Sequence, residues 1–152
     1  MNDSSLPPFR AARGPGDWEQ VPIHAYKQED GVPFKDITRR LLFASPALSC
    51  ELRYFEMAPG GYSTLERHEH VHAVLILRGR GQCLVGAEVR PVGTNDLVYI
   101  PAMTWHQFRA VAGEPLGFLC MVNAQRDKPQ LPSADELAEL RRNPAVARFL
   151  AN

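Results

Sequence analysis

The sequence predicts an all-β protein, built as an antiparallel sandwich or barrel and followed by a short helical tail. Short runs rich in β-branched and aromatic residues follow one another from residue 49 onward, with Gly-, Pro- and Asn-containing turn segments between them. These runs are CELRYFEM, HAVLILRG, GQCLVG, DLVYIP, WHQFRAV and GFLCMV. No helical pattern separates them, which favours antiparallel strands over a parallel α/β sheet.

The segments before this region are less regular. Residues 1–17 are rich in Pro, Gly and Arg and predict a flexible N-terminal arm, so we place the barrel at 18–130. A mildly alternating stretch at 34–43 predicts a peripheral strand. Because neither the arm nor this strand can bury its apolar residues on a small barrel, the sequence predicts a homodimer.

The C-terminal residues 131–152 change from strand-like to helical patterning. Ser133 and Glu136 have the spacing of a capping box. Asn143 followed by Pro144 is typical of a helix start, with Pro at the first helical position. Two short helices are therefore expected to close the chain.

Composition limits the classes of partner and compartment. The 152 residues suit one domain, and 17 Lys and Arg balance 17 Asp and Glu, so no strong field draws the chain to nucleic acid or to an anionic membrane. No uncharged apolar run approaches the roughly 20 residues of a membrane helix, and the N-terminus has no secretory pattern. Three widely spaced cysteines, Cys50, Cys83 and Cys120, suit reduced thiols. We expect a cytoplasmic protein.

Three of the five histidines stand close together at His68, His70 and His72. On an extended strand, Glu66 and these histidines would form one row of metal-binding side chains. The row would span roughly 20 Å at about 3.3 Å per residue, so both ends can serve one ion only if a turn intervenes. A solvated row of histidines at a sheet edge is the alternative.

The stretch PGGYSTLERHEHVHAVLILRGRG resembles the first conserved motif of the cupin family, and NDLVYIPAMTWHQF resembles the second. The resemblance covers about residues 49–122. It implies an antiparallel double-stranded β-helix, the jelly-roll barrel of that family, with a metal ion inside. It is the resemblance, and not the spacing alone, that favours a metal site over the solvated row.

The two motifs imply which residues hold the ion. Counting back from Gly79, His72 stands where the family usually has Glu, His68 stands at the second His position, and Glu66 stands at the first. This register puts His70 in the turn between two strands, as a residue that supports the site or lies at its mouth.

In the second motif, Pro101 and His106 match the family pattern, whereas Asn95 and Met103 stand at its two glycine positions. The implied metal ligands are therefore Glu66, His68, His72 and His106. His24 stands alone and is expected to be an ordinary surface or packing residue.

Three imidazoles and one carboxylate suit a divalent transition metal such as Fe, Mn, Ni, Zn or Cu, and open positions on the ion suit an oxygenase or an isomerase. The resemblance implies a dioxygenase that acts on a small oxygenated organic compound. A non-catalytic module that binds or senses a small molecule is the alternative, because cupins host many activities. Metal identity, substrate and catalytic residues stay open.

Two charged residues, Glu51 and Arg53, interrupt an otherwise apolar predicted strand. A charged pair inside the barrel would be a substrate anchor. A solvated face of the strand is the more common arrangement.

Overall fold

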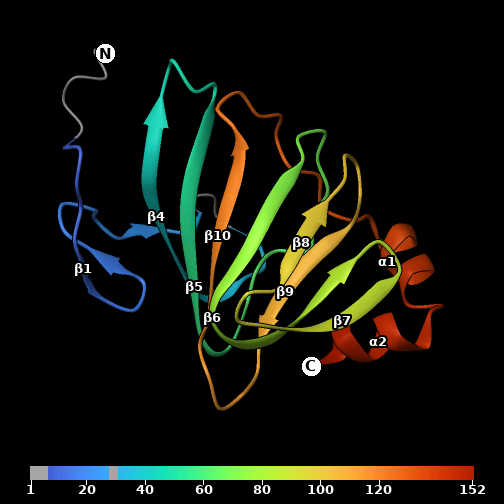
Figure 1. The fold of residues 1–152 in the computed structure, drawn as a ribbon. Coiled ribbons are helices and arrows are strands. Elements are labelled where there is room, and N and C mark those ends of the chain that lie inside the picture. The colour runs from blue at the N-terminus through green and yellow to red at the C-terminus, as the bar shows by residue number, and fades with distance from the viewer. Residues whose placement is uncertain (1–6, 28–30) are drawn as a thin grey trace.

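The computed structural model describes residues 7–27 and 31–152. Its elements, in chain order, are β1 (Ala12–Gly14), β2 (Asp17–Trp18), β3 (His24–Ala25), β4 (Lys35–Ser45), β5 (Cys50–Tyr62), β6 (His72–Val85), β7 (Glu88–Gly93), β8 (Leu97–Ile100), β9 (His106–Ala110), β10 (Leu116–Asn123), α1 (Ala134–Leu140) and α2 (Pro144–Ala151). Figure 1 shows the strands curving around a common interior, with both helices beside β7.

Two long strands, β5 and β6, close the barrel because each of them takes part in both of its walls. The first half of β6 lies between β10 and β8, and its second half lies between β7 and β9. Strand β5 pairs with β4 and β10 and reaches β9 at Tyr62. Every one of these pairings is antiparallel. The predicted antiparallel barrel is confirmed.

The interior at one end of the barrel is apolar. Side chains from β4, β5, β6, β9 and β10 alternate in and out, so their inward residues meet in one cluster. Its largest members are Phe55, Met57, Ile76, Phe108 and Phe118. The other end is polar, and it carries the histidines.

The predicted peripheral strand at 34–43 is observed as β4, and the short strand β3 pairs with its outer edge. His24 of β3 is exposed, as expected. Strands β1 and β2 form a small separate sheet, and Trp18 packs edge-on against Tyr54 with ring centroids 5.2 Å apart. Residues 1–6 of the predicted arm lie outside the described residues.

Both C-terminal helices are present, and their caps are those predicted. Ser133 and Glu136 make the reciprocal bonds of a capping box at α1, and the Asn143 side chain accepts hydrogen bonds at the start of α2. Val146 and Phe149 of α2 are buried against the barrel. In the described ranges, no helix is both long and apolar enough to cross a bilayer.

We predict that Gly79→Ala lowers the free energy of unfolding of the barrel. Gly79 lies where β6 passes from one wall to the other, with φ of +76°, and an added Cβ would stand 1.7 Å from the Pro115 carbonyl oxygen. The substitution should cost more than about 2 kcal/mol of unfolding free energy, measured by thermal or urea denaturation. Gly113→Ala is the control, because nothing lies within 4 Å of its added Cβ. Equal stability of the two variants would contradict the prediction.

Apolar side chains of the N-terminal segment and β4 remain exposed on a single chain. Phe9 is 88% exposed and Phe43 is 43% exposed. The homodimer stays a prediction. Its physical reason is that a second copy covering these residues would remove them from water. Light scattering at micromolar concentration should report the mass of two chains. A monomer would count against it.

Candidate metal centre

The two segments that carry the histidines are joined by their backbones. Glu66, in the loop between β5 and β6, forms an isolated antiparallel bridge with His106. The Glu66 N–H donates to the His106 carbonyl at 3.2 Å, and the His106 N–H donates to the Glu66 carbonyl at 3.0 Å. Beside this bridge, the Met103 N–H donates to the His68 carbonyl at 2.7 Å. Residues far apart in the sequence therefore share one wall of the cavity.

The two non-glycine positions of the second motif both have left-handed backbones. Asn95 has φ of 76° and Met103 has φ of 53°. This conformation is disfavoured for most L residues and costs glycine little, which explains why the family pattern has glycine at both positions. Asparagine tolerates it comparatively well. The conformation at Met103 is supported by its hydrogen bond to His68, and the register that selected His106 is physically consistent.

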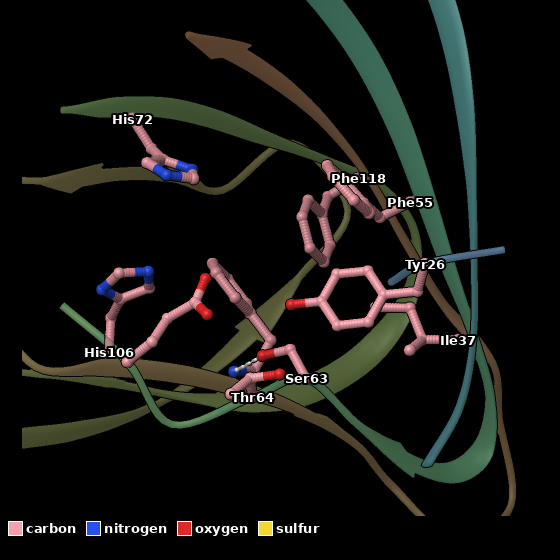
Figure 2. Close-up of a pocket in the computed structure, with 10 residues that line it drawn as sticks. Tyr26, Ile37, Phe55, Ser63, Thr64, His72, His106 and Phe118 are labelled. Carbon is pink, nitrogen blue, oxygen red and sulfur yellow. Dashed lines mark hydrogen bonds between the residues drawn. The ribbon is translucent and has the colours of Figure 1, made fainter. Parts of the chain in front are cut away.

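Three histidines come together in the described part of the chain. They are His68 from the loop, His72 at the start of β6 and His106 at the start of β9, and one ligand nitrogen from each lies within 4.8 Å of the others. Figure 2 shows His72 and His106 extending from opposite walls toward the same space. We call these three residues the histidine cluster.

Hydrogen bonds fix which ring nitrogen faces the centre of the cluster. His68 Nδ1 lies 2.6 Å from the His70 carbonyl oxygen, and His106 Nδ1 lies 2.9 Å from the Thr104 carbonyl oxygen. Because a carbonyl oxygen only accepts, each Nδ1 carries the proton and each Nε2 keeps a free lone pair. His72 Nδ1 lies 2.9 Å from Cys120 Sγ, which holds the third ring.

The spacing within the cluster fits a transition-metal ion. His68 Nε2 and His72 Nε2 are 3.0 Å apart. Metal–nitrogen bonds of about 2.1 Å place neighbouring ligands about 3.0 Å apart when the angle between them is near 90°. Because Cys120 Sγ can donate or accept, His72 Nε2 can present either a proton or a lone pair to His68 Nε2, and with the proton on Nδ1 both Nε2 lone pairs are available to a cation. The residues present therefore suit a bound divalent ion.

Burial keeps the imidazoles in the form that binds metal. Burial, reinforced by His106 and His70, lowers the pKa of His68 to about 4. Burial and the neighbouring imidazoles likewise lower the pKa of His72 to about 2, and burial lowers the pKa of His106. All three rings are therefore neutral near pH 7, which is the state required of a metal ligand.

Glu66, the fourth predicted ligand, is buried beside the cluster but has another partner. Its carboxylate forms an ion pair with Lys27, and its side chain borders the space reached by His72 and His106. The histidine cluster itself consists of the three imidazoles. Ligation by Glu66 stays a prediction, and Lys27 is a neighbour that no sequence motif had indicated.

His70 lies in the turn between two strands, as the register required. Its ring stacks on that of His68 with centroids 3.6 Å apart, and its Nδ1 lies 2.8 Å from Asp127 Oδ1. The Asp127 carboxylate also accepts from the backbone N–H of Glu69 at 2.7 Å and of His70 at 3.1 Å. Sequence reasoning missed Asp127, because a lone acidic residue after the last strand carries no motif.

The histidines border two neighbouring spaces. An outer cavity of about 490 Å³ is bordered by His68, His70 and His72 together with several charged side chains. A deeper chamber of about 30 Å³ is walled by Phe55, Phe108 and Phe118 and also reaches His72. Figure 2 shows Phe55 and Phe118 across this chamber from His72 and His106, with Tyr26 and Ile37 beside and beyond them.

Of the charged pair on β5, Arg53 does not lie on a solvated face. It is only 8% exposed and borders the outer cavity. Glu51 instead pairs with Arg126 at 2.8 Å. The less common arrangement, a charged residue inside the barrel, is the one observed for Arg53.

Comparison with known proteins agrees with this architecture. The model of the cupin domain matches residues 53–122. The chain is 57% identical over 151 residues to a Rhodospirillum rubrum protein named 1-methylthio-D-xylulose 5-phosphate methylsulfurylase, covering 99% of this chain and 97% of that protein.

Two solved structures are also similar. A cupin 2 conserved barrel domain protein of Rhodopseudomonas palustris has a TM-score of 0.88 and 61% identity, covering 93% of this chain and 97% of that one. A cupin-2 domain protein of Rhodospirillum rubrum has a TM-score of 0.84 and 55% identity, covering 96% of each chain.

We predict that His68→Ala, His72→Ala or His106→Ala abolishes stoichiometric metal, measured by elemental analysis of protein purified without an affinity tag. Each change removes a ligand that no neighbouring residue replaces. Glu66→Gln should weaken metal retention. His70→Ala should keep the metal, with affinity reduced by about 10- to 100-fold because only support of His68 is lost.

Circular dichroism should show every one of these variants folded. Metal that survives His106→Ala but is lost in His70→Ala would contradict the ligand register and would indicate a local site on the loop.

Proposed function

The chain belongs to the cupin family, and we propose that it is a metal-dependent enzyme that acts on 1-methylthio-D-xylulose 5-phosphate. The observation that carries this proposal is its 57% identity, over nearly the whole chain, to a protein named for that substrate and for transfer of a methylsulfur group. The dioxygenase implied by the family resemblance stays a prediction without support from that relative. Fold alone does not choose between the two, because cupins host unrelated reactions.

The histidine cluster supports an enzyme more than a passive binding module. Three neutral imidazoles suit a divalent transition metal and leave positions of the ion free for other ligands. A bound ion of this kind acts as a Lewis acid toward oxygen atoms such as the ketone oxygen of a ketose. The resident residues would hold the ion and orient the substrate beside it.

The two spaces around the cluster match the two halves of this substrate. The outer cavity is lined by cationic and polar side chains, as a sugar phosphate requires. The inner chamber of about 30 Å³ has aromatic walls that favour contact with sulfur. Its size suits about two non-hydrogen atoms, since a single water needs roughly 10 to 15 Å³. We propose that the methylthio group enters this chamber.

Glu66 lies where the two spaces meet, and its partner Lys27 borders the outer cavity. The Glu66 carboxylate borders both of them and is held by Lys27. A carboxylate at this position is within reach of a substrate bound at the cluster, either as a metal ligand or as a group that accepts or donates a proton. Glu66→Gln separates these roles only when metal content and activity are measured together.

We predict that the metal-containing protein consumes 1-methylthio-D-xylulose 5-phosphate. Loss of this substrate is measured by phosphorus NMR and mass spectrometry. The assay is run with and without a small thiol. Transfer of the methylsulfur group to a thiolate would form a mixed disulfide and leave the electron pair of the broken carbon–sulfur bond on C1, where the adjacent ketone would delocalise it as an enolate until a proton is added. His106→Ala should lose activity together with the metal. His24→Ala is the matched control, because this exposed histidine lies on β3 outside the cluster.

Full activity of the His106→Ala protein, or no conversion by the metal-containing wild type, would overturn the proposed function. Oxygen consumption in the same assay would favour the dioxygenase instead.

A further inference from the structure

Two arginines of the outer cavity have no acidic partner. The cationic side chains that border this cavity are Lys27, Arg39, Arg53 and Arg126. Lys27 pairs with Glu66, and Arg126 pairs with Glu51. The remaining carboxylate on the wall, Asp127, is bound to a histidine and two backbone amides. Among residues 7–27 and 31–152, no ion pair involves Arg39 or Arg53.

Both arginines also have unused hydrogen-bonding capacity away from water. The Nε atoms of Arg39 and Arg53 are buried and have no hydrogen-bond partner. Arg53 is 8% exposed, and its guanidinium lies over the Phe55 ring at 5.1 Å. A buried cation with no ion pair, as Arg53 is, is costly, so a site of this kind is completed when an anion binds.

The strand register places the two arginines side by side. Arg39 of β4 is opposite Phe55, and Arg53 of β5 is opposite Leu41, so the arginines are diagonal neighbours on one face of the sheet. Strands β4, β5, β10 and β6 follow one another in the barrel wall (Figure 1). Because long side chains of diagonal neighbours reach each other, one ligand group can contact both guanidinium groups.

The same register fixes where this pair lies relative to the histidine cluster. Arg53 is opposite Cys120 of β10, and Cys120 Sγ contacts His72 of β6. Strand β5 is two strands from β6, a separation of roughly 10 Å at about 4.8 Å per strand. A short sugar chain can span the space between a group at the cluster and a group at the arginines.

We propose that Arg39 and Arg53 form a phosphate-binding subsite that holds the phosphate monoester of the substrate. The proposal rests on the proposed function, which supplies a phosphorylated five-carbon ligand. A phosphate monoester carries close to two negative charges near neutral pH, matching two unpaired cations. The planar guanidinium group donates two parallel hydrogen bonds to phosphate oxygens. Binding the phosphate at β4 and β5 places the other end of the sugar toward the histidine cluster.

The subsite is tested by calorimetric titration of the metal-containing protein with D-xylulose 5-phosphate and with D-xylulose. Arg39→Gln and Arg53→Gln should each weaken binding of the phosphorylated sugar by about 10- to 100-fold, since each removes charged hydrogen bonds. Binding of D-xylulose should change little. Arg90→Gln is the control, because Arg90 is an exposed arginine of β7 that does not border this cavity.

Two further measurements exclude a merely structural role. Metal content should be unchanged in both variants. Without ligand, Arg53→Gln should melt at or above the wild-type temperature, because it removes an unpaired buried charge. If Arg53→Gln does not fold, the half-buried Arg39 still tests the subsite. Wild-type affinity of Arg39→Gln for D-xylulose 5-phosphate, or of a folded Arg53→Gln, would overturn the proposal.

The outcomes also separate this subsite from the proposed function. Suppose that D-xylulose 5-phosphate binds in a way that depends on the two arginines, but the methylthio substrate is not turned over. This result would support the subsite and overturn the proposed function. Turnover of the methylthio substrate with an unchanged KM in both arginine variants would keep the reaction and overturn the subsite.

Discussion

The backbone bridge between Glu66 and His106 is the contact on which the metal-binding arrangement depends. It ties the loop before β6 to the start of β9, and the Met103 to His68 hydrogen bond adds a second tie beside it. The pairing of β6 with β9 fixes His72 relative to His106, and the two ties add the loop residue His68 to that frame. Because the ties are made by backbone groups, the position of the cluster does not depend on a bound ion.

Electrostatics divides the cavity into two regions of different character. At the cluster, burial keeps the imidazoles neutral, so their lone pairs are available to a cation. At β4 and β5, the half-buried Arg39 and the buried Arg53 form no ion pair and keep a buried Nε without a hydrogen-bond partner, which suits the proposed binding of an anion. A ligand with an electron-rich ketone at one end and a phosphate at the other is complementary to both regions.

The ion pair between Lys27 and Glu66 connects these regions. A carboxylate that is already neutralised by an ammonium group is a weaker donor to a metal than a free one, so Lys27 reduces the tendency of Glu66 to act as a fourth ligand. The same pair places one ammonium group and one carboxylate at the border of the outer cavity.

The sequence by itself determined the barrel, the terminal helices and the histidines that form the cluster. Strand alternation, turn residues and helix caps are local signals that predict the elements. The resemblance of two segments to family motifs indicated His68, His72 and His106. The left-handed backbones of Asn95 and Met103 explain the family's preference for glycine at these two positions, which this chain fills with other residues.

Only the tertiary structure decided the surroundings of the cluster. Lys27, Asp127 and Cys120 come from segments with no motif. Lys27 meets Glu66, Asp127 meets His70 and Cys120 meets His72 only because the strands close into a barrel. The sequence likewise left Arg53 between a buried anchor and a solvated face. Strand parity states which residues share a face, whereas burial of that face depends on what the rest of the chain places over it.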